Sequence, residues 1–473
     1  MNRVLEEFKE LSKIPRPSFH EEKIRDYLYN WAIKKNIYVE KDEFKNIFMK
    51  KPASKGYENY SPIALQAHTD MVCEAAEGVD IDFLNDSIEI FIDGDIVSTH
   101  GKTTLGADNG LGVSTILSIL SDNSLNHPQI EAIFTSCEEE DFSGSNGFDG
   151  SKITAKHFIN LDHCKNNEII SSSAGGITIT STKKLEKISL ENNFISYKII
   201  INGLIGGHSG EDINKGRGNS NTLLFRFLNS LNFNYNIVTI KGGSFRLAIP
   251  RESIIEIAFS KENLSNFKNL VEKFSKTLQN EFQSNEKINI NFEQTTCSSC
   301  YSSKYNKEIE NFILLSPVDI QIMNDSFENV VSASCNIGEI YIKDDLFTVI
   351  SDIRANIDTQ RDFISQKILS LANLTNFKTN VWGSYYSWTY KKDSELRELT
   401  KKIYDKNNDT KTEILSIHAG LECGFFSHKL PELDIISIGP DSWDFHSPNE
   451  RFSINSLNKF YKNLLEILEN AKF

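Results

Sequence analysis

The sequence contains no long apolar segment. Residues 1–13 are charged and amphipathic and lack the apolar core of a secretory signal. No later stretch approaches the roughly 20 apolar residues that a membrane-spanning helix needs. These absences argue against a secreted or membrane-embedded protein, so we expect a cytoplasmic protein without a membrane partner.

Positive charge is also in deficit. The chain has 51 Lys and Arg residues against 65 Asp and Glu residues, which gives a net charge of -14. Proteins that bind nucleic acid or anionic lipid need clustered basic residues to replace phosphate counterions. The composition therefore predicts no nucleic-acid partner and fits small neutral or cationic substrates better.

Cysteine is sparse and odd in number. Seven cysteines spread along the chain fit free thiols in a reducing compartment. Cys297 and Cys300 form a Cys-x-x-Cys pair, but no second such pair or nearby histidine accompanies them. They are therefore half of a zinc site at most, and a coincidence in a surface loop is the favoured interpretation.

Apolar runs alternate with helical patterns in the first third of the chain. Short runs that we interpret as strands cover residues 63–67, 130–134 and 158–161, and a helical stretch covers residues 111–120. Ser18-Phe-His-Glu21 has the pattern of a capping box that opens an earlier helix. Alternation of this kind predicts an α/β fold with a mixed sheet flanked by helices.

The length of 473 residues exceeds what one core usually serves, so we expect two domains. Strand-like patterns dominate the middle of the chain, which predicts an inserted α+β lid. The catalytic domain is then discontinuous, with a first part at 1–186, the lid at 187–386 and a second part at 387–473. The lid is long enough to hold two similar halves.

Acidic residues and histidines follow the predicted strands. In open α/β sheets the ligand site lies beyond the carboxyl ends of the strands. Carboxylate oxygens and imidazole nitrogens are ligands for divalent metals. A set converging there could hold two metal ions and one reactive water, and its members are His68, Asp70, Asp108, Glu138, Glu139, Asp162 and His446.

Each of these positions also has an ordinary explanation. His68 and Asp70 together fit a strand-end turn with a solvated carboxylate, although Asp70 could instead hold the ring of a ligating histidine from behind. Asp108 could bridge two ions, or it could cap a helix. His163 could compete with Asp162 as a ligand.

The run Glu138-Glu139-Glu140-Asp141 is typical of a solvated loop. It directly follows an apolar strand, however. One glutamate could coordinate metal while its neighbour takes the proton of a bridging water, whose pKa a bound divalent ion lowers from about 15.7 toward ~7.

Two further residues stand out in the predicted lid. His208 lies among four glycines, where an imidazole could stabilise an oxyanion, although an exposed turn explains it equally well. Arg354 lies in a strand pattern and could bind a carboxylate with two hydrogen bonds. It could also pair with Asp352 or Asp358.

Several sequence blocks occur together in the order found in one enzyme family. The chain resembles the metallopeptidase M20 family nearly end to end, and most of all its aminoacyl-histidine dipeptidase branch, also called peptidase D or Xaa-His dipeptidase. Blocks in a fixed order are far more specific than any single motif. They are Ile14–Glu22, Ala67–Val72, Thr103–Gly110, Ala174–Gly176, Gly206–Gly210, Ile417–Gly424, Ser437–Pro440 and His446–Pro448.

By position, the resemblance implies roles for these residues. It implies two zinc ions, with cobalt or manganese as substitutes, and Asp108 as the bridging ligand. The implied metal ligands are His68, Asp108, Glu139, Asp162 and His446. The implied catalytic residues are Asp70, which orients His68, and Glu138, the general base and then general acid. The implied substrate-binding residues are His208 at the tetrahedral intermediate, Asn219 and Arg354 at the C-terminal carboxylate, and Glu422 at the free amine.

The implied activity is zinc-dependent hydrolysis of dipeptides, Xaa-His types among them, by a metal-bridging hydroxide. Another M20 hydrolase, such as an aminoacylase or a tripeptidase, and an inactive peptide-binding relative remain alternatives. At Glu140-Asp141 the chain departs from the small residue and glycine of the family pattern. The resemblance is compatible with a homodimer and leaves open whether the lid histidine acts within one chain or across a dimer.

Overall fold

The computed structural model describes residues 3–190, 192–282, 286–408 and 410–473. The chain forms two compact units. Unit 1 comprises Met1–Ser173, Trp388–Ser416 and Leu421–Phe473, and unit 2 comprises Ala174–Ser387 and Ile417–Gly420.

The first boundary between the units differs from the predicted one. We expected the first part of the catalytic domain to be 1–186, of which residues 1 and 2 lie outside the described residues. The boundary lies after Ser173 because strand β9 (Gly175–Lys184) belongs to the sheet of unit 2. The second boundary, expected after residue 386, lies after Ser387. The short return of Ile417–Gly420 to unit 2 has no counterpart in the sequence prediction.

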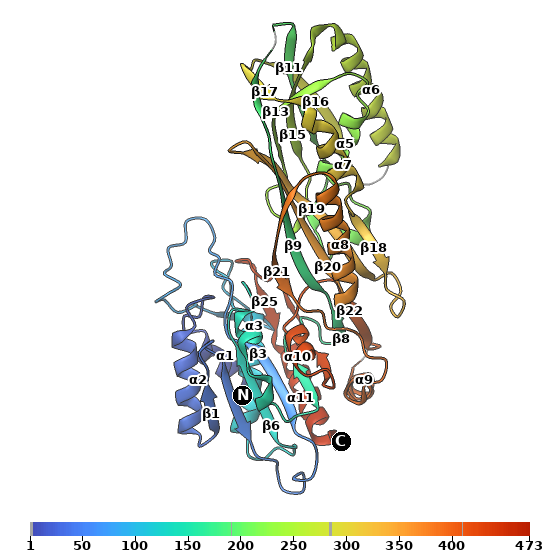
Figure 1. The fold of residues 1–473 in the computed structure, drawn as a ribbon. Helices are drawn as coiled ribbons and strands as arrows, with labels where there is room; N and C mark the ends of the chain where they lie inside the picture. Colours follow the sequence, from blue (N-terminus) through green and yellow to red (C-terminus); the bar gives the residue numbers. More distant parts are fainter. Residues whose placement is uncertain (1–2, 191, 283–285, 409) are drawn as a thin grey trace. The chain divides into compact units, whose positions relative to one another are not determined.

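An eight-stranded mixed sheet forms the centre of unit 1 (Figure 1). Its four middle strands run parallel, and antiparallel pairs flank them. The sheet confirms the strands predicted at 63–67, 130–134 and 158–161. The strand order is β1 (Tyr38–Lys41), β2 (Ile47–Lys51), β6 (Ile130–Thr135), β3 (Ile63–His68), β7 (His157–Asn160), β23 (Asp434–Ser437), β8 (Glu168–Ser173) and β22 (Glu413–Ile417).

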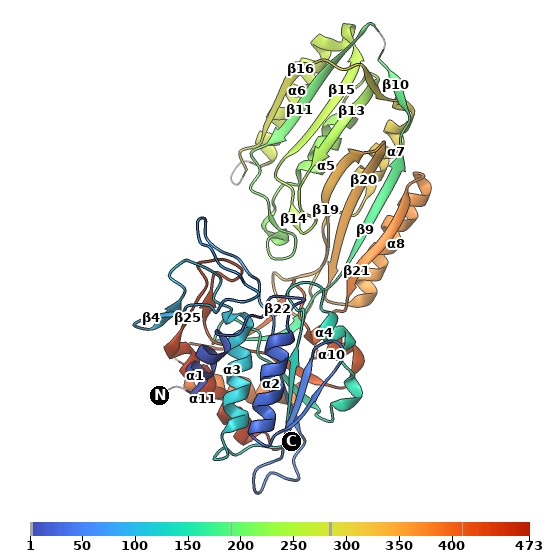
Figure 2. The same cartoon turned by 90° about the vertical axis from the view of Figure 1, so that its left-hand side faces the viewer.

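Helices pack on both faces of this sheet (Figure 2). The faces follow from the alternation of side chains along each strand. In β7, Ile159 belongs to the main core, while the Phe158 ring lies 4.7 Å from that of Phe426 on the other side. The main-core face carries α1 (Arg3–Leu11), α2 (Glu22–Lys34), α3 (Ala107–Ser121), α9 (Glu395–Asn407) and α11 (Ile454–Asn470), and the other face carries α4 (Ser143–Gly147) and α10 (Cys423–Lys429).

The predicted capping box at Ser18–Glu21 was wrong. Helix α2 begins at Glu22, and Glu21 makes no side-chain hydrogen bond as its N-cap. Glu21 Oε1 instead accepts hydrogen bonds from the backbone N–H groups of Phe19 (3.0 Å) and Cys137 (3.1 Å). The Ser18 hydroxyl donates to Asp70 Oδ2 at 2.8 Å. Residues that resemble a helix cap thus support two loops far away in the sequence.

A small sheet at the edge of unit 1 holds the segment that carries His446. Its strands are β24 (Ser442–Trp443), β25 (Arg451–Ser453), β5 (Ile96–Ser98) and β4 (Phe91–Asp93), paired in that order. The antiparallel pair β24 and β25 encloses residues 444–450 as its loop. The fold thereby fixes both ends of a loop whose sequence alone predicts little structure.

Unit 2 contains an antiparallel sheet whose main path runs β16 (Asn289–Thr295), β11 (Phe194–Asn202), β15 (Ser253–Ser260), β13 (Tyr235–Gly242), β19 (Val331–Lys343), β20 (Leu346–Ala355), β9 and β21 (Lys378–Tyr385), with β18 (Asp319–Met323) paired to β19. Ile199 on β11 and Ile257 on β15 enter one hydrophobic cluster, while the residues that precede them, Lys198 and Glu256, stay partly exposed. One face of this sheet is therefore covered, by α5 (Ser220–Asn229), α6 (Leu264–Glu281), α7 (Asn306–Leu315) and α8 (Asp358–Leu374) (Figure 1).

Two composition-based expectations can be compared with this fold. None of the helices in the described residues is long and apolar enough to cross a membrane. All seven cysteines are free thiols, as predicted, and Cys300 lies buried in the short strand β17 (Ser299–Tyr301).

Candidate metal centre

The carboxyl ends of three parallel strands bring the predicted acids and histidines to one edge of the unit 1 sheet. Strand β3 ends at His68, which pairs with Thr135 at the end of β6. Glu138 and Glu139 follow β6, and Asp162 follows β7. The register of neighbouring strands thus places residues from separate parts of the chain side by side.

Asp108 lies between two histidines. Its Oδ1 atom is 3.0 Å from His68 Nε2, and its Oδ2 atom is 3.5 Å from His446 Nε2. The residue lies in the kinked first turn of α3, whose N-cap is Gly106, so Asp108 is not the cap. A carboxylate that presents one oxygen to each of two imidazoles has the arrangement of a bridging ligand.

Each side of Asp108 has a further carboxylate. On the His68 side, Asp162 Oδ1 lies 3.5 Å from His68 Nε2. On the His446 side, Glu139 Oε2 lies 3.0 Å from His446 Nε2. Ligand atoms of His68, Asp108 and Glu139 all lie within 4.8 Å of one another. The structure therefore brings all five predicted ligands together, two on either side of the central carboxylate.

Asp70 stands behind His68. The ring atom His68 Nδ1 lies 3.2 Å from the Asp70 backbone oxygen and 3.4 Å from Asp70 Oδ1. A proton on Nδ1 satisfies this contact and leaves the lone pair of Nε2 facing Asp108 and Asp162. That tautomer is the one a metal ligand requires.

Burial and mutual repulsion raise the pKa values of two carboxyl groups in this cluster. Burial, followed by the negative charges of Asp162, Glu139 and Glu422, raises the pKa of Glu138 well above its usual value. Burial and the charge of Asp108 raise the pKa of Asp162 to about 8, even though His68 opposes the shift. Buried carboxylates that repel one another in this way favour bound cations, so the donor set fits two divalent metal ions.

The histidines of the cluster show the opposite effect. Hydrogen bonds to Asp108 and Glu139 raise the pKa of His446 to about 10. Burial lowers the pKa of His68, but Asp162 and Asp108 outweigh it and raise the pKa well above 6.5. Protons on His68 and His446 can therefore balance part of the negative charge that bound cations would otherwise balance.

Two other predictions concern residues beside the cluster. His163, the competing ligand, lies with its Nε2 atom 3.0 Å from Glu168 Oε2 instead. Glu422 is completely buried, and its Oε2 atom accepts hydrogen bonds from Gln66 (2.5 Å) and Thr135 (2.8 Å). In this position the carboxylate supports β3 and β6 from within unit 1. Its contact with a substrate amine stays a prediction.

His208 lies in unit 2 on the short strand β12 (Gly207–His208), which pairs with β14 (Ala248–Ile249). Its Nδ1 atom accepts hydrogen bonds from the backbone N–H groups of Gly210 (3.3 Å) and Glu211 (3.1 Å). The neutral ring therefore carries its proton on Nε2. Burial and the positive charge of Arg354 lower its pKa, so the ring is a neutral hydrogen-bond donor.

Arg354 lies on β20 and is almost completely buried. Its Nη1 atom donates to the Tyr385 hydroxyl at 3.2 Å, and Nε lies 3.4 Å from Asp352 Oδ2. The alternative pairing with Asp352 is thus partly present, whereas Asp358 lies 3.0 Å from Arg361. Since Asp352 also accepts from Arg246, one carboxylate is shared between two guanidinium groups.

The predicted contact between Asn219 and a substrate carboxylate stays a prediction. Asn219 is the N-cap of α5, and its Oδ1 atom accepts from the N–H groups of Asn221 and Thr222. Its Nδ2 atom donates to Asn336 Oδ1 (3.1 Å) and to the Ile337 oxygen (3.2 Å). Every polar atom of this side chain already has a protein partner, which indicates a structural role.

His418 is a buried residue of unit 2 to which the sequence analysis assigned no role of its own. Its Nε2 atom lies 2.7 Å from Ser334 Oγ and its Nδ1 atom 3.1 Å from Asn356 Oδ1. Burial, then the charges of Arg354 and His208, lowers its pKa to about 3. The only signal in the sequence was its place in the block Ile417–Gly424.

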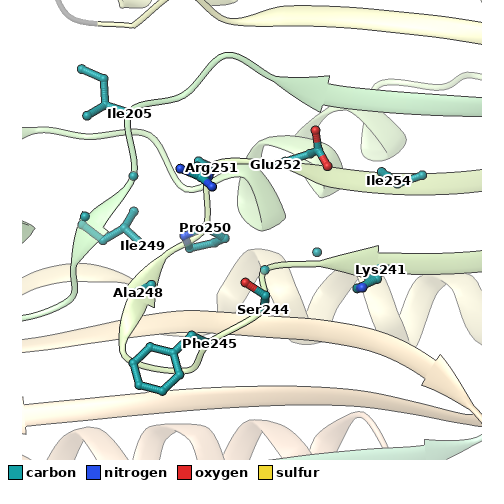
Figure 3. A pocket seen from close by; sticks show the side chains of 14 residues that line it. Ile205, Lys241, Ser244, Phe245, Ala248, Ile249, Pro250, Arg251, Glu252 and Ile254 are labelled. Carbon is teal, nitrogen blue, oxygen red and sulfur yellow. The ribbon is translucent and has the colours of Figure 1, made fainter. Parts of the chain in front are cut away.

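Unit 2 also contains a pocket of about 500 Å³ (Figure 3). Gly206 and Gly207, which precede His208, form part of its wall. Lys241, Arg251 and Glu252 contribute charges of both signs. The lining therefore does not select one class of ligand, and we assign the pocket no role.

Comparisons with known proteins show the family to which the chain belongs. Residues 64–470 match the family described as Peptidase family M20/M25/M40. The cytosol non-specific dipeptidase of Escherichia coli strain K12 is 35% identical over 467 residues, which are 98% of this chain and 96% of that protein.

Solved structures give the same result. The aminoacylhistidine dipeptidase of Vibrio alginolyticus superposes with a TM-score of 0.92 at 33% identity, over 99% of this chain and 96% of its own. The aminopeptidase PepT of Bacillus cereus, with a TM-score of 0.57 and 15% identity over 99% and 98% of the two chains, shares the fold. The chain belongs to the M20 family of metallopeptidases.

Proposed function

We propose that this chain is a cytoplasmic two-zinc dipeptidase that hydrolyses small dipeptides, Xaa-His types among them. The observation that carries the proposal is the position of Asp108, whose two oxygens face His68 and His446 at 3.0 and 3.5 Å. Near full-length similarity to proteins named as dipeptidases supports the substrate class.

Five side chains would hold the metals. His68 and Asp162 would bind one ion, His446 and Glu139 the other, and Asp108 both. Two divalent ions bound there would lower the pKa of water and polarise the scissile carbonyl. The donors are oxygen and nitrogen atoms only, which is compatible with zinc and with cobalt or manganese.

Glu138 would serve as the general base. Its Oε2 atom lies 3.9 Å from His68 Nε2, so it faces the cluster while its neighbour Glu139 contacts His446. A carboxylate that faces the cluster in this way is placed to accept a proton from the attacking water. It would then return the proton to the leaving amine.

Unit 2 would recognise the substrate. The Nε2–H group of His208 is suited to donate a hydrogen bond to the oxyanion of the tetrahedral intermediate. The buried guanidinium of Arg354 is suited to the C-terminal carboxylate of a dipeptide. Both assignments are proposals that rest on contacts within unit 2 alone.

A substrate panel tests the proposal. The metal-free chain is supplied in turn with zinc, cobalt and manganese and assayed on dipeptides, tripeptides and N-acyl amino acids. We expect the highest kcat/KM on dipeptides. A higher kcat/KM on tripeptides or N-acyl amino acids would indicate a tripeptidase or an aminoacylase. Metal binding without turnover of any substrate would indicate an inactive peptide-binding relative.

Light scattering on the same sample tests the predicted homodimer.

A further inference from the structure

Arg16 is a buried arginine of unit 1 that contacts no predicted metal ligand through its side chain. The residue is 2% exposed. Its Nη1 atom donates to the backbone oxygens of Thr69 (3.0 Å) and Asp70 (3.1 Å), and Nη2 donates to the oxygen of Gly106 (2.5 Å). One guanidinium therefore joins the segment that follows His68 to the segment that precedes Asp108.

Glu450 contacts the same loop from its N–H side. This carboxylate is also 2% exposed. Its Oε2 atom accepts from the backbone N–H groups of Leu105 (2.7 Å) and Gly106 (2.9 Å), and Oε1 accepts from that of Asp108 (3.1 Å). Glu450 ends the loop that carries His446. It therefore joins the His446 loop to the Asp108 loop.

Gly106 is the point at which the two charges meet. Arg16 binds its carbonyl oxygen, and Glu450 binds its N–H group. Its φ of +69° favours glycine, and a Cβ atom there would lie 2.4 Å from Arg16 Nη2. The local backbone and the absent side chain both make room for the guanidinium.

We propose that Arg16 and Glu450 are positioning residues of the metal centre. Together they connect the backbones of three separate segments, which carry His68, Asp108 and His446. Asp108 must place one oxygen near each histidine, so a shift of its loop changes both distances at once. The pair sets the affinity for metal through the backbone and touches neither metal nor substrate. This inference rests on the proposed metal-dependent function.

Conservative substitutions separate this role from simple packing. In Glu450→Gln the side chain keeps its size, but one oxygen becomes an NH2 group that faces backbone N–H donors, so at least one of the three hydrogen bonds is lost. In Arg16→Lys the positive charge stays, but a single ammonium group replaces the planar fork that reaches both segments.

Glu131 provides a matched control within the same unit. It is completely buried and accepts hydrogen bonds from the backbone N–H groups of Thr154 (2.8 Å) and Ala155 (3.0 Å). It lies near the start of β6, at the end of the strand opposite to Glu138. Glu131→Gln therefore removes a similar buried contact without touching a ligand-bearing loop.

The test compares zinc affinity with folding stability in the full chain. Each metal-free variant is titrated with zinc against a chelating indicator, and its unfolding by urea is measured without metal. We expect Glu450→Gln and Arg16→Lys to bind zinc about 10–100-fold more weakly than wild type. Glu131→Gln should lose stability but keep the wild-type affinity.

Two results would overturn the inference. One is a wild-type zinc affinity in both Glu450→Gln and Arg16→Lys, and the other is an equal loss of affinity in Glu131→Gln. If Glu450→Gln does not fold, Arg16→Lys decides by the same criterion. A wild-type chain that binds no zinc would instead contradict the proposed function, so the two failures are distinguishable.

Discussion

The Asp70 carboxylate accepts a hydrogen bond from the backbone N–H of Glu138 at 3.1 Å. Its second oxygen accepts from the N–H of Glu139 at 3.2 Å and from the hydroxyl of Ser18 at 2.8 Å. The same buried side chain lies 3.4 Å from His68 Nδ1. Asp70 thus lies against the ring of a predicted ligand and also binds the backbone of both Glu138 and Glu139.

Asp70→Asn should impair both functions. An amide would present NH2 protons where two backbone N–H groups and an imidazole N–H now donate, so some of these contacts must break. We expect zinc affinity and kcat/KM on a dipeptide each to fall about 10–100-fold.

Ser18→Ala is the matched control for Asp70→Asn. It removes one hydrogen bond to the Asp70 carboxylate and leaves the carboxylate in place, and a hydrogen bond to a charged group contributes about 1.5–3 kcal/mol to stability. Zinc titration and steady-state kinetics on both variants provide the comparison. Equal zinc affinity and activity in Asp70→Asn and wild type would show that Asp70 is not needed to orient the site.

Arg354→Lys should weaken binding of substrates that have a free C-terminal carboxylate. The variant keeps the charge but loses the geometry for two parallel hydrogen bonds. Charge-assisted hydrogen bonds contribute about 1.5–3 kcal/mol, so kcat/KM should fall about 10–100-fold, mainly through KM. The corresponding dipeptide amide should be hydrolysed equally by both proteins.

Arg226→Lys is a suitable comparison for the arginine variant, since Arg226 forms an exposed ion pair with Glu281 in the same unit. The kinetic assay should not distinguish it from wild type. If Arg354→Lys reduced activity on the free acid and on the amide to the same extent, Arg354 would not be the carboxylate-binding residue.

His418 should make the stability of the metal-free chain depend on pH. Its pKa is about 3 in the folded chain and about 6.5 in the unfolded chain, because burial disfavours the imidazolium. Between these values the unfolded chain binds the extra proton, so the free energy of unfolding decreases as the pH falls.

The variant His418→Gln removes this titration and keeps a side chain that can donate and accept hydrogen bonds. Between about pH 6 and pH 4, wild type should lose up to ~1.4 kcal/mol per pH unit more than the variant. Urea unfolding at both pH values measures the difference. Parallel losses in the two proteins would show that His418 is not held neutral by the fold.

Much of the site could be predicted because strand ends are visible in a sequence. The apolar runs before His68, Glu138 and Asp162 marked strands β3, β6 and β7, and parallel strands end at a common edge. The distinction between Glu138 and Glu139 came from the resemblance, because two adjacent glutamates are equivalent in composition. The structure adds that Glu139 contacts His446, whereas Glu138 faces His68.

The residues that support the site could not be predicted in this way. Glu21 and Ser18 fit a capping box in the sequence, yet their partners are Cys137 and Asp70. Glu450 binds backbone N–H groups about 345 residues away, and a backbone donor leaves no trace in the identity of the residue that carries it. Such contacts depend on tertiary structure alone.

The predicted boundary between the two units was misplaced for a related reason. Strand β9 continues directly from the segment that leaves unit 1, and no change in composition marks the point where it joins the second sheet. Its partners β20 and β21 lie far along the chain. The unit to which β9 belongs is decided by this long-range pairing, which the local sequence does not encode.

In the proposed mechanism Glu138 provides the base at a two-metal site that Glu139 helps to build. The most direct measurement compares metal content and dipeptide turnover in wild type, Glu138→Ala and Glu139→Ala. We predict two divalent ions per chain in wild type and in Glu138→Ala, with turnover in wild type only, and loss of metal in Glu139→Ala. Full turnover by Glu138→Ala, or full metal content in Glu139→Ala, would contradict the account.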